Sequence, residues 1–435
     1  MITLEGTSME RLVKIENFLG YYIVEGPLKI RLIEGFMEVT GKRLDVNEEV
    51  VIPTAKATLI EAPRGAKIEL RGSGTVNKLE ASTVPREWLN LIDSLPKDSL
   101  VFALGCIDVG KTFFVTYTAN KLLSKGFKVS VVDCDVGQSD IGPPTTIGLS
   151  ILDKQVAFLE SAPLTSAYFV GSTSPAGHLL PMITGTLKLV SHAKRVGGTI
   201  LVDTPGMVHG GPARAYQLYA IESISPDVIV ALQRNHELSH LTKQLKALGY
   251  DVLELPASPW VRQRDREDRR ALRERAFYNY FAKRGLVDHT ISLDKVAIVG
   301  SFMGSGCRAP PETIQVIESI AGCRVEYCEI SQDAVVLVLE EKPRSKDFYA
   351  SVRSAFSDKT VKFAVRGFER GLVVGLLGEK SSFLDIGILK SIDFKAMRVS
   401  ISTPLRNVEQ VRVIKLGCVR LEEYREVEKL EPGFI

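Results

Sequence analysis

Gly105-Cys106-Ile107-Asp108-Val109-Gly110-Lys111-Thr112 is a complete phosphate-binding loop of the form G-x-x-x-x-G-K-[ST]. The apolar run 100–104 predicts a buried strand before it, and residues 113–125 predict a helix after it. The glycines let the backbone wrap a polyphosphate, while successive N–H groups and the helix N-terminus favour anions. Lys111 can reach the terminal phosphates and Thr112 can hold Mg²⁺. We therefore expect a nucleoside triphosphate to bind at residues 105–112.

The sequence around this loop alternates apolar strands with amphipathic helices. Strands are expected to end at Leu104, Asp133, Gly171, Asp203, Leu232 and Leu255. Helices are expected between them, for example over 179–193, 212–222 and 238–248. This rhythm predicts an α/β fold with a mostly parallel sheet covered on both faces. Ligands of such sheets bind at the carboxyl ends of the strands, where the phosphate loop also lies.

Two flanking regions have a different character. Residues 1–85 consist of short alternating strands separated by glycine and proline, which predicts a β-rich N-terminal domain. Residues 86–288 form the phosphate-loop domain, including an arginine-rich segment near its end. Residues 289–435 mix strands and helices, which predicts a C-terminal α/β domain without a catalytic constellation.

Composition limits the classes of function. The chain has 435 residues, 25% of them charged, and a net charge of +3, so any nucleic-acid contact needs a local basic patch. We find no signal-peptide pattern and no apolar run of membrane-spanning length. The six cysteines form no C-x-x-C pair, which argues against a zinc ribbon or a thioredoxin-like site. A reducing cytoplasm is the expected compartment.

Two carboxylates follow the strand 129–132. Asp133 and Asp135 are spaced i, i+2, so on a strand they point to the same side. One could organise Mg²⁺ through water and the other could accept a proton from an attacking hydroxyl. The alternative is a pair of surface residues that cap a strand, but the neighbouring phosphate loop and the following Gly137-Gln138 favour a functional pair.

A second acidic motif raises a rival function. Residues 203–206, Asp-Thr-Pro-Gly, match the D-x-x-G of GTPase switches. Guanine selectivity normally needs N-K-x-D, however. Residues 77–80 end in Glu and precede the phosphate loop, and residues 120–123 lack the acid. A regulatory GTPase is therefore a minority hypothesis.

The segment from Arg262 to Arg275 contains seven arginines. Guanidinium groups bind phosphate bidentately and neutralise the charge of a transferring phosphoryl group. Interleaved acids leave a solvated helix as an equal alternative on composition alone. In a continuous helix Arg269 and Arg273 would share a face and Arg264 would not, so we expect Arg264 in the turn before the helix.

Residues 236–240, His-Glu-Leu-Ser-His, match the zinc-protease motif H-E-x-x-H. The extended motif fails because Lys243 and Lys246 stand where glycine and the third histidine are required. Asn235 also suggests a helix start at the motif itself. Exposed polar residues of a crossover helix are therefore the favoured interpretation.

In this order, the motifs resemble the polynucleotide 5′-hydroxyl kinases related to the kinase subunit of the pre-mRNA cleavage and tRNA-splicing machinery, especially the archaeal members. The resemblance covers nearly the whole chain. It is carried by residues 108–112, by residues 135–138 and by the arginine segment that ends at Tyr280-Phe281.

The resemblance implies roles for individual residues. Asp135 is similar to the residue that activates the substrate hydroxyl, and Arg264 and Arg269 to lid arginines that close over the phosphates. Thr112 and Asp133 are the candidates for the metal side, although family members need not keep an acid at the second position. The implied substrate contacts are Gln138, Ser174, Thr204, Gly206 and Met207, and Lys56 resembles a nucleotide contact from the N-terminal domain.

The chain departs from the family pattern at Met207. Family members often carry tryptophan after the glycine equivalent to Gly206, where it can stack on a base. Stacking is worth about 1–3 kcal/mol per base, so affinity or base preference at this contact should differ.

These features together predict an ATP-dependent kinase that uses Mg²⁺ or another divalent cation. Its substrate would be the 5′-hydroxyl of RNA, with DNA left open, in RNA processing or repair and with RNA-processing proteins as partners. The non-enzymatic alternative is an ATP-binding scaffold subunit of an RNA-processing complex. Because Asp135, Arg264 and Arg269 are all present, we favour the enzyme.

Overall fold

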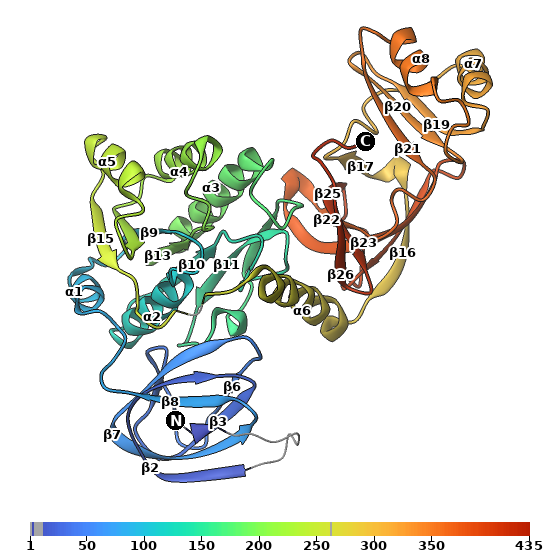
Figure 1. Ribbon diagram of the computed structural model, residues 1–435. Coiled ribbons are helices and arrows are strands. Elements are labelled where there is room, and N and C mark those ends of the chain that lie inside the picture. The colour runs from blue at the N-terminus through green and yellow to red at the C-terminus, as the bar shows by residue number, and fades with distance from the viewer. Residues whose placement is uncertain (1, 4–11, 262) are drawn as a thin grey trace. The chain divides into compact units, whose positions relative to one another are not determined.

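The computed structural model describes residues 2–3, 12–261 and 263–435 (Figure 1). The chain forms two compact units. The first consists of Met1–Gly142, Thr146–Tyr168 and Leu179–Leu272, and the second of Pro143–Thr145, Phe169–His178 and Arg273–Ile435. The first unit therefore holds both the N-terminal region and most of the phosphate-loop region. The finer division at residues 85 and 288 stays a prediction.

The N-terminal part of the first unit is all β, as expected from its alternating pattern. In β3 the residues Leu28, Ile30 and Leu32 are buried while their neighbours are more exposed, which is the period of a half-buried strand. The sheet order is β1-β8-β2-β7-β3-β6, with β4 and β5 attached to β7. The bounds are β1 Ile2–Thr3, β2 Leu12–Glu25, β3 Leu28–Gly35, β4 Glu38–Val39, β5 Lys42–Arg43, β6 Glu49–Ile52, β7 Ala57–Gly72 and β8 Thr75–Leu79.

The second part of the first unit is built on the phosphate-loop sheet, whose order is β12-β11-β10-β13-β9-β14-β15. The five neighbouring strands β10, β13, β9, β14 and β15 are parallel, and β11 is antiparallel to β10. The prediction of a mostly parallel sheet is therefore confirmed. Strands β9, β10 and β13 are buried throughout, which explains their apolar sequences. The bounds are β9 Leu100–Gly105, β10 Val129–Asp133, β11 Thr146–Leu152, β12 Ser166–Phe169, β13 Thr199–Asp203, β14 Val228–Gln233 and β15 Val252–Pro256.

Helices cover this sheet on both faces (Figure 1). Helix α2 packs against β9, β10 and β13 with α1 beside it, and α3 packs against β10, β11 and β13 with α4 beside it. The bounds are α1 Arg86–Ser94, α2 Lys111–Ser124, α3 Leu179–Val196, α4 Gly211–Ile224, α5 Ser239–Ala247 and α6 Arg266–Arg284. The last of these helices crosses from the first unit into the second.

The N-terminal sheet and the phosphate-loop domain pack as one body. Ile23 and Leu59 belong to the same hydrophobic core as Trp88 and Phe114. The buried amide of Asn120 on α2 donates to the carbonyl oxygens of residues 40 and 156, both at 2.8 Å. These contacts fix the N-terminal sheet beside the helix that follows the phosphate loop.

The second unit contains a seven-stranded sheet in which β26 pairs with β25 beside the order β16-β24-β23-β22-β25-β17, and a four-stranded sheet with the order β18-β19-β20-β21. Its 3-10 turns apart, the bounds are β16 Val287–Ser292, β17 Ala297–Val299, β18 Cys307–Arg308, α7 Pro311–Ala321, β19 Val325–Ile330, β20 Ala334–Leu339, α8 Phe348–Ala355, β21 Thr360–Val365, β22 Leu372–Leu377, β23 Phe383–Asp393, β24 Arg398–Thr403, β25 Val413–Glu422 and β26 Arg425–Lys429.

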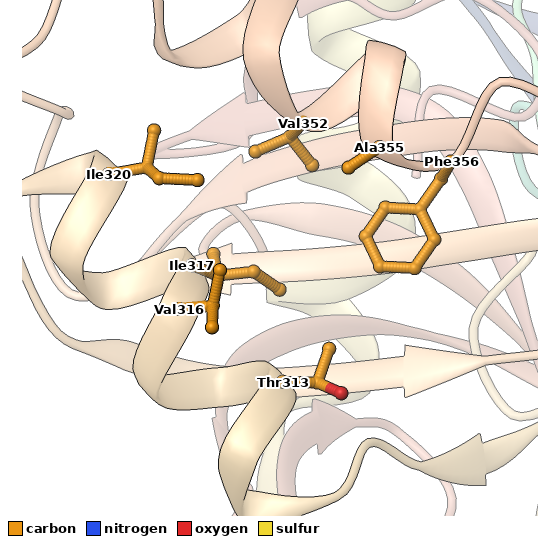
Figure 2. Close-up of a pocket in the computed structure, with 7 residues that line it drawn as sticks. All are labelled: Thr313, Val316, Ile317, Ile320, Val352, Ala355 and Phe356. Atoms are coloured by element: carbon orange, nitrogen blue, oxygen red, sulfur yellow. The ribbon is translucent and has the colours of Figure 1, made fainter.

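Figure 2 shows a pocket of this unit between α7 and α8. Ile317 and Ile320 face Val352 and Phe356 across it, and none of its lining residues is charged. It therefore offers nothing that would bind a phosphate.

None of the helices in the described part of the chain combines the length and the apolar character of a transmembrane helix.

Candidate active site

The phosphate loop joins β9 to α2 and requires its glycines. Gly110 has φ of 95°, which a residue with a side chain rarely adopts, and a Cβ there would lie 2.7 Å from Val261. A Cβ on Gly105 would lie 2.6 Å from a methyl group of Val109. The backbone of the loop is thus packed closely from both sides, and the strand-loop-helix arrangement predicted for residues 100–125 is confirmed.

Lys111 is the first residue of α2 and its side chain is buried. Its ammonium group donates to the carbonyl oxygens of Gly105 at 3.0 Å and Cys106 at 2.9 Å. Burial lowers the pKa of Lys111, while the carboxylates of Asp203 and Asp135 act in the opposite direction. The two hydrogen bonds place the amino group of Lys111 inside the curve of the loop, where it would stabilise an anionic phosphate.

The hydroxyl of Thr112 donates to Oδ2 of Asp203 at 2.6 Å. Asp203 is the last residue of β13, which lies directly beside β9 in the sheet and brings the carboxylate to the loop. Burial raises the pKa of Asp203 to about 7, against the lowering effects of Lys111 and of the Thr112 hydroxyl. In the sequence Asp203 belongs to the D-x-x-G motif of residues 203–206, and no local pattern connects it with Thr112.

Asp133 ends β10, one strand further from the loop strand. Its carboxylate accepts hydrogen bonds from the backbone N–H groups of Asp135 at 3.0 Å, Asp140 at 2.7 Å and Ile141 at 3.0 Å. Burial raises the pKa of Asp133 well above its ordinary value. These bonds hold the turn that carries Asp135, and the metal role of Asp133 stays a prediction.

Asp135 is oriented by its own turn. Its Oδ1 accepts from the backbone N–H groups of Gly137 and Gln138, both at 3.1 Å. Burial raises the pKa of Asp135, while Lys111 and these two donors lower it. A carboxylate held this way has a fixed direction and a raised affinity for a proton, which are the properties of a general base. Its role as the proton acceptor stays a prediction.

The arginine segment meets the phosphate loop through Asp108. Oδ2 of Asp108 accepts from the backbone N–H of Arg264 at 3.1 Å and from Nη2 of Arg269 at 3.3 Å. Helix α6 begins at Arg266, so the expectation that Arg264 lies in the turn before the helix is confirmed. Arg262, the first arginine of the segment, lies outside the described residues.

Three buried donors of this region lack a hydrogen-bond partner. They are Nε of Arg264, Nε of Arg269 and Nε2 of Gln138. The other end of the Gln138 amide accepts from Nη1 of Arg264 at 3.3 Å, so these groups lie together. Buried polar groups without partners are rare in proteins. A ligand rich in acceptor oxygens, such as a polyphosphate, fits this set of donors.

Lys56 lies in an ion-pair cluster. Its ammonium group is 2.7 Å from Asp140 and 2.6 Å from Glu160. Burial alone would lower the pKa of Lys56, but the two carboxylates outweigh this effect and raise it. Lys56 thereby ties the N-terminal sheet to the loop that follows Asp135, and its predicted nucleotide contact stays a prediction.

The segment after β13 lies against the phosphate loop. The hydroxyl of Thr204 donates to the carbonyl oxygen of Ala103 at 2.7 Å, and a Cβ on Gly206 would lie 2.6 Å from the backbone N of Ile107. Met207 is half-buried. Thr204 and Gly206 therefore serve first to fit this segment onto the loop, and their contacts with a substrate stay predictions.

Ser174 belongs to the second unit. Its N–H donates to the hydroxyl of Ser172 at 3.1 Å, and its own hydroxyl accepts from the N–H of Ala176 at 3.3 Å. Because these bonds close a tight turn, the hydroxyl of Ser174 has a defined position in that unit. Its predicted contact with the substrate end stays a prediction.

The H-E-x-x-H stretch does not present two histidines on one helix. Helix α5 begins at Ser239, and His236 precedes it with φ of 57°. The carboxylate of Glu237 accepts from the N–H of Arg234 at 2.9 Å and of Asn235 at 2.7 Å, as a cap of this turn. Within the described ranges, no group of three or more His, Cys, Asp or Glu residues could hold a metal.

Comparisons with known proteins agree with this geometry. A family model described as the P-loop of the mRNA cleavage and polyadenylation factor CLP1 matches residues 105–283. The chain is 32% identical over 339 residues to a polyribonucleotide 5′-hydroxyl-kinase of Pyrococcus furiosus, covering 76% of this chain and 90% of that protein. It is 33% identical to another of Thermococcus kodakarensis, covering 78% of this chain and 94% of that protein.

Solved structures show the same fold. The structure of wild-type Clp1p in complex with Pcf11p residues 454–563 aligns with a TM-score of 0.65 and 14% identity, covering 96% of this chain and 99% of that chain. Because the archaeal relatives match at 30% identity or more over most of their length, the chain belongs to the family of polyribonucleotide 5′-hydroxyl kinases.

Proposed function

We propose that this protein transfers the γ-phosphate of ATP to the 5′-hydroxyl of RNA. The observation that carries the proposal is the link from the phosphate loop to two arginines through Asp108, with unpartnered guanidinium donors beside Gln138. These donors fit a polyphosphate, and in a kinase they would also neutralise the transferring phosphoryl group, which a scaffold that only holds ATP never forms. The names of the archaeal relatives support the same reaction.

The residues of the loop and lid would act by charge and position. Backbone N–H groups of residues 105–112 would bind the phosphates, and Lys111, Arg264 and Arg269 would neutralise the transferring phosphoryl group. Asp135 would accept the proton of the 5′-hydroxyl as the oxygen attacks phosphorus. The bond from phosphorus to the bridging oxygen of ADP breaks, so the products are ADP and a 5′-phosphorylated end.

The donors around Thr112 fit a divalent cation such as Mg²⁺. Thr112 and Asp203 would hold it, because their hydroxyl and carboxylate oxygens lie within hydrogen-bond distance and Mg²⁺ completes its shell with water and substrate phosphates. Asp133, the other candidate for the metal side, would act indirectly by holding the turn that carries Asp135. A bound cation would neutralise charge on the β- and γ-phosphates.

In the first unit, Gln138 and the segment 204–207 would contact the acceptor, with Lys56 near the nucleotide. The family resemblance adds a separate acceptor contact at Ser174 of the second unit. A ribose 5′-hydroxyl is common to RNA and DNA ends, so both classes of oligonucleotide belong in the test. The likeness to a Clp1p structure solved with Pcf11p supports a further proposal, that proteins of RNA processing are partners.

The test is transfer of label from γ-labelled ATP to RNA and DNA oligonucleotides with 5′-hydroxyl ends. Lys111→Ala and Asp135→Asn should each lower the rate by at least about a hundredfold. Lys125→Ala is the matched control, because Lys125 lies just beyond α2 and pairs with Asp93 away from the loop. ATP binding without label on any oligonucleotide would leave the scaffold function.

A further inference from the structure

The segment 169–178, which carries Ser174, is built into the C-terminal sheet. The N–H of Cys418 on β25 donates to the carbonyl oxygen of Gly171 at 2.7 Å, and Lys415 donates to that of Phe169 at 3.0 Å. A Cβ on Gly375 would lie 2.5 Å from the ring of Phe169. Because Gly375 has no side chain, the ring of Phe169 can pack on the sheet at this position, and this packing fixes the start of the segment.

The second half of α6 rests on the same sheet. Phe277 and Phe281 are fully buried and share a hydrophobic core with Phe169, Val373 and Val419. The helix therefore leaves the lid turn at Arg266 and ends in the core that also holds the segment 169–178. Helix α6, here called the lid helix, and the segment 169–178, here called the substrate segment, therefore both pack on one core of the second unit.

One carboxylate joins the two. Glu426 on β26 accepts from the hydroxyl of Thr173 at 2.8 Å, and the same oxygen lies 3.4 Å from Nε of Arg273 on α6. The side chains are largely buried, with 10% of Glu426 and 18% of Arg273 exposed. Thr173 is adjacent to Ser174 in the chain, and Arg273 lies one helical turn after Arg269.

We propose that Glu426 is a positioning residue for phosphoryl transfer, which couples the substrate segment at Thr173 to the lid helix at Arg273. This inference rests on the proposed kinase function and deepens it. Glu426 does not touch the reacting atoms. By holding Thr173 and Arg273 with one carboxylate, it fixes the second half of α6 against the turn that carries Ser174.

The test measures kcat and KM for RNA and for ATP in Glu426→Ala. We expect kcat/KM for RNA to fall about ten- to hundredfold, as for small misplacements of positioning groups, while the Kd for ATP stays within about twofold. Glu426→Gln keeps an acceptor for Thr173 but loses the charge opposite Arg273, so its loss should be intermediate. Glu428→Ala is the matched control, because Glu428 lies on the same strand, pairs with Arg420 and has an exposed side chain.

Single variants separate positioning from folding. Thr173→Val and Arg273→Met each remove one arm, and adding Glu426→Ala to the double variant should cause little further loss. These variants also decide the question if Glu426→Ala fails to fold. Wild-type kinetics in Glu426→Ala, or equal losses in Glu428→Ala, would overturn the inference. Absence of transfer by the wild-type protein would instead overturn the kinase function itself.

Discussion

Asp108 of the phosphate loop lies 3.3 Å from the guanidinium of Arg269, and the same carboxylate oxygen accepts from the N–H of Arg264 at 3.1 Å. The residue has φ of 53°, and its carbonyl oxygen accepts from Arg234 at 2.9 Å. A loop residue that should face anionic phosphates thus carries a negative charge that is matched by arginines. Asp108 thus joins the phosphate loop directly to the lid arginines Arg264 and Arg269.

We therefore expect Asp108→Ala to lower kcat by about tenfold or more, because Arg264 and Arg269 lose the group that holds them near the loop. Asp108→Asn keeps an acceptor for the N–H of Arg264 and should lose less. Steady-state transfer assays at saturating ATP measure the effect. Full activity in Asp108→Ala would show that the arginines find their positions without it.

Asp203 and Asp133 should separate into metal and fold roles. Asp203→Asn should raise the Mg²⁺ concentration for half-maximal rate by at least about tenfold, because it removes the charged partner of Thr112. Asp133→Ala should mainly destabilise the protein, by about 3 kcal/mol, because three backbone N–H groups lose their acceptor.

A magnesium titration and thermal unfolding of both variants distinguish these outcomes. Thr112→Ser, which retains the hydroxyl, serves as the control for the titration. The reverse pattern, with a changed magnesium requirement only in the Asp133 variant, would assign the metal to Asp133, as predicted from the sequence.

Lys56→Met should destabilise the first unit by about 2 kcal/mol, because Asp140 and Glu160 lose a largely buried partner. The folded-state pKa of Lys56 is raised. Its contribution to stability should therefore be fully present below the ordinary lysine pKa, about 10.4, and disappear as the pH rises through the folded-state value. Thermal unfolding across neutral and alkaline pH measures both effects.

Lys67 offers a matched control, because it also pairs with two carboxylates, those of Glu16 and Glu34, but is exposed. Lys67→Met should change the unfolding temperature far less. If Lys56→Met left stability unchanged and raised the KM for ATP, Lys56 would be the nucleotide contact that the family resemblance implied. Its ion pairs with Asp140 and Glu160 would then not stabilise the fold.

The elements around the loop were predictable because their signals are local. The strand 100–104, the glycines and the helix after Lys111 are contiguous, and the position of Arg264 before α6 follows from helical periodicity. Two Asp-terminated strands were also visible in the sequence. Which of them lies beside the loop strand depends on the strand order, which no local pattern records.

The contacts of the second unit were beyond reach for the same reason. Glu426 and Thr173 are separated by 253 residues, and nothing in either neighbourhood announces the other. The sequence of the C-terminal region has no catalytic motif, and its contacts with the segment 169–178 are backbone bonds to Gly171, the packing of the Phe169 ring over Gly375, and one carboxylate.

Met207 offers a gain-of-affinity experiment. The residue is half-buried, and its carbonyl oxygen accepts from the amide of Gln217 at 3.1 Å, so the backbone position is held whatever the side chain. Met207→Trp should supply an aromatic face for a base and lower the KM for RNA about tenfold, which corresponds to stacking of about 1.4 kcal/mol. Met207→Leu, similar in size without an aromatic ring, is the control.

Transfer assays on oligonucleotides that differ only in the terminal base test the contact, because stacking should favour purines with their larger faces. Equal KM values for the Trp and Leu variants on every base would mean that no base reaches this side chain.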